Sequence, residues 1–406
     1  MKKNTQIISL LLIFILSGIK LFSQAEYDYT GRELNTITTA VPFLMIAPDA
    51  RAGGLGDAGV ASTPDANSLH WNPAKYAFIK KDMGFSVSYS PWLRALVNDI
   101  NLAYLSGYKK FGKDQAVAVS LLYFSLGDIT FTNDIGNTIG QFKPSEYAID
   151  ACYSRKLSEV FSGGISLRYI HSNLTGGQFV GGAESHAGNS VATDVSVYYQ
   201  TELDFGKTPA EFAAGLNISN IGTKISYTET TVRDFIPINM RIGPTLTLNL
   251  DDYNSLAIMI DINKLLVPTP PVYETDSNNN PVKDPNGEQI ILAGKNPDVS
   301  VVSGVFQSFG DAPGGLKEEI KEFTISTGIE YWYDKQFAIR GGFFYEDPTK
   351  GNRKYFTLGA GLKYNVFGLD FAYLIPVEQH NPLENTLRFT LLFDFDAFKD
   401  QNKTEK

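Results

Sequence analysis

Residues 387–396 read LRFTLLFDFD, a stretch in which apolar and polar side chains alternate. Side chains of a β-strand point to opposite faces with a period of two, so the stretch predicts a strand with one apolar face. Residues 367–375, FGLDFAYLI, repeat the pattern immediately upstream. The apolar face of the last strand carries Leu387, Phe389, Leu391, Phe393 and Phe395.

The same alternation recurs from residue 83 to residue 398. It predicts about fourteen strands, an even number, as single-chain bacterial barrels have. The strands are expected near residues 83–93, 98–110, 114–127, 142–156, 159–172, 189–201, 209–221, 236–249, 253–266, 323–333, 336–346, 354–364, 366–376 and 385–398.

The connections between these segments alternate in length. Tight turns are expected at residues 109–113, 156–158, 251–252, 334–335 and 365. Longer connections are expected at residues 128–141, 173–188, 222–235, 267–322, 347–353 and 377–384. An outer-membrane barrel has short periplasmic turns at one end and long outer loops at the other. A soluble two-sheet sandwich does not require this alternation of loop lengths. The sequence therefore predicts an all-β, antiparallel transmembrane barrel over residues 81–398, followed by a polar tail, 399–406.

The first residues have the composition of a secretory signal peptide. Lys2 and Lys3 precede an apolar stretch, Ile7–Leu16, and cleavage is expected after Ser23. The stretch is shorter than the roughly 20 residues of a membrane-spanning helix, which disfavours a transmembrane anchor. Residues 1–23 are therefore expected to be removed on export to the outer membrane.

Composition argues against several other classes of protein. A net charge of −9 and a pI near 5.1 disfavour nucleic acid as a partner. Cys152 is the single cysteine, and the four histidines show no metal-ligand spacing. Charged residues on the polar strand faces are expected to be solvated in the lumen rather than catalytic: Asp150, Arg168, Asp194, Asp261, Glu330, Arg340 and Asp370. No catalytic set, cofactor or metal site is expected, and so the protein is not expected to be an enzyme.

Residues 24–80 lack the strand pattern and contain a glycine-rich run. Gly54, Gly56 and Gly59 satisfy G-x-G-x-x-G, but a dinucleotide site needs a βαβ unit around that motif, and here a barrel follows. Glycines also permit close backbone approach in a narrow lumen. Asn72-Pro73 is expected to end a short helical turn. The segment is interpreted as a plug, with residues 40–80 on the periplasmic side of the lumen.

This segment also carries a family resemblance. Residues 51–78, RAGGLGDAGVASTPDANSLHWNPAKYAF, resemble the N-terminal hatch of the FadL-like outer-membrane transporters, whose barrels have fourteen strands. Residues 40–61, AVPFLMIAPDARAGGLGDAGVA, most resemble the PorV (LptO) branch, the barrel component of the Bacteroidetes type IX secretion system.

The resemblance, rather than any spacing of residues, implies a set of partners. It implies docking on a large SprA-like translocon barrel and binding of exported cargo through the cargo's C-terminal signal domain. It also implies delivery of that cargo to a sortase-like machinery at the cell surface, which attaches it to lipopolysaccharide. Membrane lipid surrounds such a barrel.

The loop 267–322 is the longest connection and the best candidate for contact with a protein partner. Its Pro-rich start is expected to project from the rim, a turn is expected at Asp284–Gly287, and a helix at Leu316–Phe323 is expected to turn Lys317, Glu318 and Glu319 outward. The candidate docking residues are Pro268, Pro270, Pro271, Val301 and Phe306.

Two functions remain open at this level. One is a protein-docking barrel that acts through its outer loops. The other is a FadL-like transporter for hydrophobic small molecules, which needs a path past the plug and an apolar pocket. Strand patterns do not distinguish the two, because neither a pocket nor a lateral opening is visible in them.

Overall fold

The computed structural model describes residues 34–94, 97, 99–132, 135–177, 179–180, 183–206, 208–228, 233–276, 280–378 and 381–395. The expected signal peptide, 1–23, and the expected tail, 399–406, lie outside the described residues. No helix in the described part of the chain is long and apolar enough to cross a membrane.

Fourteen antiparallel strands close into a barrel, as the alternation predicts. Each strand pairs with the next one along the wall, and β1 pairs with β20 to close it. The wall consists of β1 (Met83–Pro91), β2 (Asn101–Phe111), β3 (Gln115–Ser125), β6 (Ser145–Lys156), β7 (Phe161–Asn173), β10 (Gly188–Phe205), β11 (Thr208–Gly222), β12 (Asn239–Asn249), β13 (Asn254–Leu265), β16 (Phe323–Tyr333), β17 (Phe337–Tyr345), β18 (Lys354–Tyr364), β19 (Phe367–Pro376) and β20 (Leu387–Asp394).

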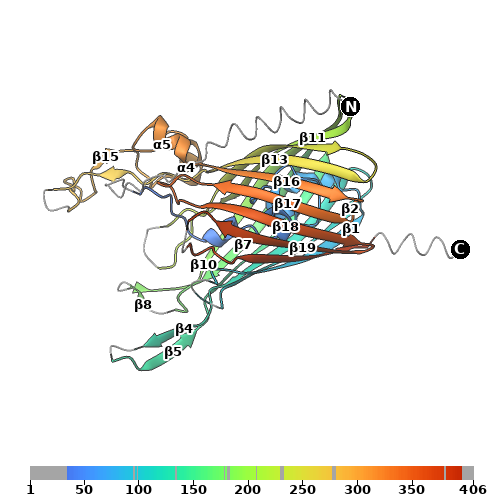
Figure 1. The fold of residues 1–406 in the computed structure, drawn as a ribbon. Helices are drawn as coiled ribbons and strands as arrows, with labels where there is room; N and C mark the ends of the chain where they lie inside the picture. The colour runs from blue at the N-terminus through green and yellow to red at the C-terminus, as the bar shows by residue number, and fades with distance from the viewer. Residues whose placement is uncertain are drawn as a thin grey trace. The chain divides into compact units, whose positions relative to one another are not determined.

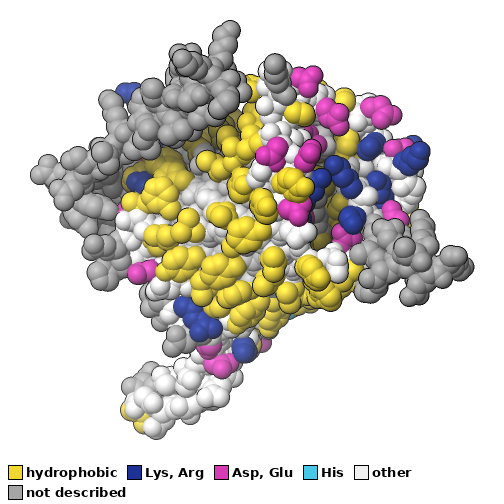
Figure 2. Space-filling view, turned by 45° about the vertical axis from the view of Figure 1, so that its right-hand side comes forward, with side chains coloured by type: hydrophobic (Ala, Val, Ile, Leu, Met, Phe, Trp, Pro, Cys, Tyr) yellow, Lys and Arg dark blue, Asp and Glu magenta, His cyan; other side chains and the backbone are white. Residues whose placement is uncertain are grey.

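The two faces of the wall differ in chemistry because side chains alternate along each strand. Aliphatic and aromatic residues such as Val119 and Leu167 are exposed on the outer face, and apolar side chains cover much of the wall in Figure 2. This is the apolar band that the hydrocarbon of a bilayer requires. In the same view, charged side chains gather at one end of the barrel.

Long and short connections lie at opposite ends of the barrel (Figure 1). The long-loop end carries three hairpins and two helices. The hairpins are β4 (Ile129–Thr132) with β5 (Thr138–Phe142), β8 (Phe179–Val180) with β9 (Ala183–Glu184), and β14 (Val272–Tyr273) with β15 (Ile291–Ala293). The helices are α4 (Val301–Gln307) and α5 (Leu316–Lys321). By the rule for such barrels, the long loops face outward and the short turns face the periplasm.

The chain before β1 forms four short helical turns: η1 (Pro42–Met45), α2 (Ala50–Gly53), α3 (Ser68–Trp71) and η2 (Pro73–Phe78). Helix α2 contacts β18, β19 and β20, whereas η2 contacts β6, β7 and β10. These strands lie on opposite sides of the closed wall, and the contacts use the inward-facing side chains. Residues 41–79, called the lumen segment below, therefore lie inside the barrel.

The lumen segment extends further along the lumen than the periplasmic side where the sequence places it. Phe43 packs near Phe124 towards the long-loop end, with the two ring centroids 6.3 Å apart. The carbonyl of Ile79 accepts a hydrogen bond from Lys110 Nζ at 2.8 Å, towards the short-turn end. An apolar cluster that includes Val41, Phe43 and Leu44 packs against inward-facing residues of the wall and the bases of the long loops.

Candidate functional site

The glycine-rich run of the lumen segment lies against the inner wall. Gly56 adopts a left-handed backbone, φ 68°, which disfavours any side chain, and its N–H donates to Thr357 Oγ1 at 2.9 Å. A Cβ atom on Gly56 would lie 2.6 Å from the backbone nitrogen of Phe343. A Cβ on Gly54 would lie 3.0 Å from the Cα of Gly359. These glycines let the backbone approach the wall closely.

The third glycine is held by a carboxylate of the wall. Asp261 Oδ2 accepts hydrogen bonds from the backbone N–H groups of Gly59 at 2.7 Å and Val60 at 2.8 Å. A Cβ on Gly59 would lie 2.5 Å from the ring of Trp71, so the position also has no room for a side chain. Asp261 thus fixes the turn in place.

Asn72 links the segment to itself and to the wall. Helix α3 ends at Trp71, as the sequence predicts, and Pro73 opens η2. The buried Asn72 amide donates to the carbonyls of Val60 and Val197, both at 3.0 Å, while its Oδ1 accepts from Ala74 N at 3.0 Å.

A chain of buried ion pairs crosses from the segment to the wall. Arg51 contacts Glu330 through two hydrogen bonds, at 2.7 and 3.0 Å, and Asp65 at 2.8 Å. Glu330 also accepts from Arg340 at 2.7 Å, and Arg340 reaches Asp370 at 2.6 Å. A separate pair joins Asp57 of the segment to Arg388 of β20 at 2.6 Å. Paired charges of opposite sign offset the cost of burial.

These contacts correct one prediction about the strand charges. The seven residues named above do face the lumen, but they are buried rather than solvated: six form ion pairs, and Asp261 accepts backbone hydrogen bonds instead. Arg168, for example, pairs with Asp150 at 2.5 Å and Asp194 at 3.1 Å. The reason is that the lumen segment and the neighbouring strands displace water from around them.

Two further charged groups of the segment escaped notice in the sequence. Burial, helped by the charge of Asp65, raises the pKa of Asp49 to about 6, and Asp49 accepts from Trp71 Nε1 at 2.6 Å. Burial lowers the pKa of Lys75 to about 8, and its Nζ donates to the carbonyl of Gly59 at 2.8 Å. The signal that could have identified them is a charged residue within a segment that is expected to lie inside the lumen.

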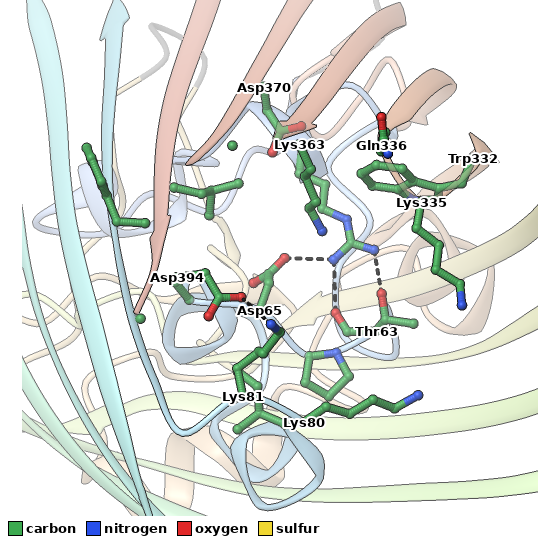
Figure 3. A pocket seen from close by; sticks show the side chains of 18 of the residues that line it. Thr63, Asp65, Lys80, Lys81, Trp332, Lys335, Gln336, Lys363, Asp370 and Asp394 are labelled. Carbon is green, nitrogen blue, oxygen red and sulfur yellow. Dashed lines mark hydrogen bonds and ion pairs between the residues drawn. The ribbon is translucent and has the colours of Figure 1, made fainter. Parts of the chain in front are cut away.

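A cavity of about 630 Å³ lies at the short-turn end, beneath the segment (Figure 3). Its lining combines Thr63–Ala66 and Phe78–Lys81 of the segment with the turns at Asp334-Lys335 and Asn365-Val366. Arg51 is one of the lining residues, and it donates hydrogen bonds to Asp65 and to Thr63. Lysines and carboxylates both line the cavity, so its charge does not single out one class of ligand.

The longest loop, residues 266–322, is held at its base by a second group of buried charges. Lys264 Nζ contacts Glu322 at 2.6 Å and Glu319 at 3.3 Å. Lys350 Nζ contacts Glu318 at 2.6 Å and Glu322 at 3.1 Å. The Thr269 hydroxyl donates to Glu322 at 2.7 Å. The loop is therefore tied down at both of its ends.

The two helices of this loop expose large apolar side chains. Val302 and Phe306 of α4 are 67% and 75% exposed, and Leu316 and Ile320 of α5 are 75% and 62% exposed. Residues four apart share one face of a helix, so each helix presents a pair of large apolar side chains to solvent. These four residues are called the apolar loop face below.

Two expectations about the loop are wrong. The Pro-rich start does not project from the rim: Pro268 and Pro271 are buried and Pro270 is half-buried, because Thr269 is bonded to Asp311 and Glu322 below it. Helix α5 forms and exposes Lys317, as expected, but Glu318 and Glu319 turn inward to the lysines while Leu316 and Ile320 face outward. Val301 is half-buried against the core, and Phe306 alone of the candidate docking residues is fully exposed. The Asp284–Gly287 turn forms as predicted, closed by Gly287 N–H to Asp284 O at 3.0 Å.

Comparisons with known proteins place these features in a family. The family model described as "Type IX secretion system protein PorV" matches residues 29–272, more than half of the chain. A search of curated proteins found no match.

Among solved structures, the Ralstonia pickettii toluene transporter TbuX has a TM-score of 0.44 and 10% identity, over 86% of this chain and 97% of that chain. A Pseudomonas aeruginosa FadL homologue has a TM-score of 0.44 and 12% identity, over 89% of this chain and 99% of that chain. The Pseudomonas putida toluene transporter TodX has a TM-score of 0.44 and 11% identity, over 89% and 98% of the two chains.

Proposed function

Because the chain belongs to the PorV family of type IX secretion system proteins, and so lies in the outer membrane, we propose that it is a non-enzymatic docking barrel. In this proposal it docks on a large translocon barrel and binds the C-terminal signal domain of exported cargo. It then hands the cargo to the attachment machinery of the cell surface.

The observation that carries the proposal is the apolar loop face. Four large apolar side chains stand exposed on two helices at the long-loop end, which is the end that faces outward. Exposed apolar surface of this kind marks a site of protein contact. Buried ion pairs hold α5 in place, and α4 packs on the apolar cluster through Val301 and Val305, so little ordering would be needed on binding.

The test replaces the α4 pair in the full-length protein, Val302→Asp with Phe306→Asp. Co-purification with the translocon barrel is expected to fall about tenfold or more, with a matching loss of cargo secretion. Ile135→Asp is the matched control, because Ile135 is an exposed apolar residue on a different loop at the same end. Normal co-purification and normal secretion by the α4 variant would overturn the proposal, provided that heat-modifiable gel mobility shows a folded barrel.

Cargo binding is tested separately on α5. Leu316→Asp with Ile320→Asp is expected to weaken binding of a purified cargo signal domain, measured by calorimetry on the barrel in detergent. Retention of translocon binding by this variant would assign the two helices to different partners. Loss of neither interaction would remove α5 from the proposed surface.

We further propose that the lumen segment acts as a plug. Its contacts with opposite sides of the wall and its packing around Phe43 support that role. The alternative function, transport of a hydrophobic small molecule, has less support. The cavity at the short-turn end carries charged groups, Arg51 and Lys363 among them, beside its apolar side chains, and covering such groups with an apolar ligand would cost free energy. Uptake of a labelled fatty acid into proteoliposomes would favour the alternative.

A further inference from the structure

One hairpin of the wall is longer than its neighbours. The pairing of β10 with β7 ends at Tyr199↔Phe161, and the pairing of β11 with β12 ends at Ala210↔Leu248. Beyond these points β10 and β11 pair only with each other, out to Phe205↔Thr208. At about 3.3 Å a residue, Thr201–Phe205 extends roughly 16 Å beyond the end of β7 that begins at Phe161. Residues 201–205 and 208–209 are called the overhang below.

The overhang lies at the short-turn end, because the β10–β11 turn is one of the short connections (Figure 1). That end faces the periplasm in a barrel of this type. Most periplasmic turns here close directly at the rim, so the overhang is the part of the wall best placed to meet a periplasmic protein.

The backbone of the overhang leaves one edge open. Gln200 N–H donates to Val160 O at 2.8 Å, on the side of β7. Backbone groups of successive strand residues point to alternate sides, so the N–H groups of Glu202 and Asp204 point to this same side, beyond the end of β7. No strand in the described part of the chain pairs with them there. The carbonyl of Glu202 accepts only a long hydrogen bond, 3.4 Å, from the adjacent Thr201 hydroxyl.

The charges around this edge are mainly negative. Glu202 lies directly opposite Glu211 in the hairpin, and Asp204 lies on the same face as both. None of the three forms an ion pair with another residue that the structure describes. Residues 201–212 contain three acidic residues and one lysine, Lys207, which gives a net charge of −2.

The opposite face of the overhang is apolar. Leu203 and Phe205 are both exposed there. The acidic face and the apolar face together indicate which kind of strand could pair with this edge. Pairing with a second copy of the overhang would set acidic residues against each other, which is unfavourable. A strand with basic residues on one face and aliphatic residues on the other would complement both faces.

We propose that the overhang is a strand-addition site for an extended, lysine- or arginine-bearing segment of a periplasmic protein. The added strand would pair with the open N–H groups of Glu202 and Asp204, as peptides pair with exposed sheet edges in other proteins. The site is distinct from the apolar loop face, since it lies at the other end of the barrel.

The test measures binding of a fluorescein-labelled octapeptide of alternating lysine and valine to the full-length barrel in detergent, by fluorescence anisotropy. Asp204→Pro removes one edge N–H without removing a bond between β10 and β11, and is expected to weaken binding about tenfold. Glu202→Gln with Asp204→Asn keeps the edge and removes charge, so its remaining affinity is expected to depend little on salt. Equal affinity of wild type and the proline variant would overturn the proposal.

Peptide controls separate pairing from simple charge attraction. The same peptide with N-methyl groups along one edge is expected to lose binding, and a glutamate–valine peptide is expected not to bind. Equal binding of the N-methylated peptide would overturn strand addition.

A cross-linking measurement keeps the test valid if the proline variant perturbs the hairpin. Cys152 is buried, so Asp204→Cys supplies the accessible thiol, which exchanges with a lysine–valine peptide whose cysteine is activated as a thiopyridyl disulfide and releases the thiopyridone. The matched control is Asn249→Cys, an exposed position at the same end, on β12. Preferential cross-linking at position 204 supports the site, and equal cross-linking at both positions overturns it.

Discussion

The lumen segment and the 266–322 loop are both fastened by buried charges, yet they leave opposite surfaces. In the lumen, Arg51 and Asp57 pair with wall residues, and apolar side chains of the segment are buried in the core. In the loop, Lys264 and Lys350 hold the base, while apolar residues such as Phe306 remain exposed. Buried ion pairs fix position in both regions. Exposed apolar side chains distinguish the loop, which we propose contacts a partner, from the lumen segment, whose apolar side chains are buried within the chain.

The largest expected effect is from deleting residues 41–78, all but the last residue of the lumen segment. The charged wall residues would then be solvated, and the lumen would lose the packing around Phe43. We expect the barrel to insert but to pass small solutes, with a clear rise in single-channel conductance in planar bilayers. Unchanged conductance would show that the segment does not close the lumen. Replacing residues 272–293 of the loop with a Gly-Ser connector is the control, expected to leave conductance low.

The next effect concerns a single charge of the lumen. Glu330→Gln leaves Arg51 and Arg340 short of their shared partner, so we expect a loss of about 3–5 kcal/mol in the free energy of unfolding. Urea titration followed by heat-modifiable mobility measures it. The matched control is Lys81→Gln, which breaks the half-exposed pair with Asp394 and is expected to cost less than about 1 kcal/mol. Equal losses of unfolding free energy in the two variants would mean that the buried ion pairs of the lumen stabilise the protein no more than an exposed pair does.

A smaller effect is expected where the backbone meets the wall. Gly56→Ala introduces a Cβ at a positive φ and against the backbone of Phe343, so we expect a loss of about 2–3 kcal/mol. Gly112→Ala has a similar φ, 62°, in a turn with nothing nearby, and is expected to lose only about 1 kcal/mol. The difference between the two variants isolates the close approach. Equal losses of unfolding free energy in the two variants would show that the lumen segment moves away from the wall at little cost.

The smallest effect on stability is expected on the loop. Phe306→Asp changes an exposed side chain, so the free energy of unfolding should stay within about 0.5 kcal/mol of wild type. A much larger loss, measured by the same urea titration, would mean that Phe306 packs within the protein. The loop would then resemble the lumen segment, with its apolar side chains buried instead of exposed.

Much of the wall was predictable. All fourteen strands lie where the alternation places them. The period of two along each strand and the lengths of the connections are both properties of neighbouring residues in the chain, so the sequence shows them directly. The inward direction of Glu330 and Arg340 follows from the same period. Their burial does not, since it depends on a segment roughly 280 residues away in sequence entering the lumen.

The 266–322 loop shows that the sequence predicts a helix more reliably than the direction of its side chains. The sequence located helix α5 and the exposed Lys317 but placed Glu318 and Glu319 outward, because a charged residue on a surface helix normally points to water. Lys264 and Lys350, on distant parts of the chain, reverse that orientation by pairing with Glu319 and Glu318.

The sequence by itself thus determined the barrel, the number of its strands and the position of the glycine-rich segment ahead of it, because each depends on spacing along the chain. Tertiary structure alone decided which charges are paired, which apolar side chains are left exposed and which strand edge stays open. Each of these depends on what a closed wall brings together: ion pairs between distant residues, and the offset between neighbouring strands that leaves Glu202 and Asp204 beyond the end of β7.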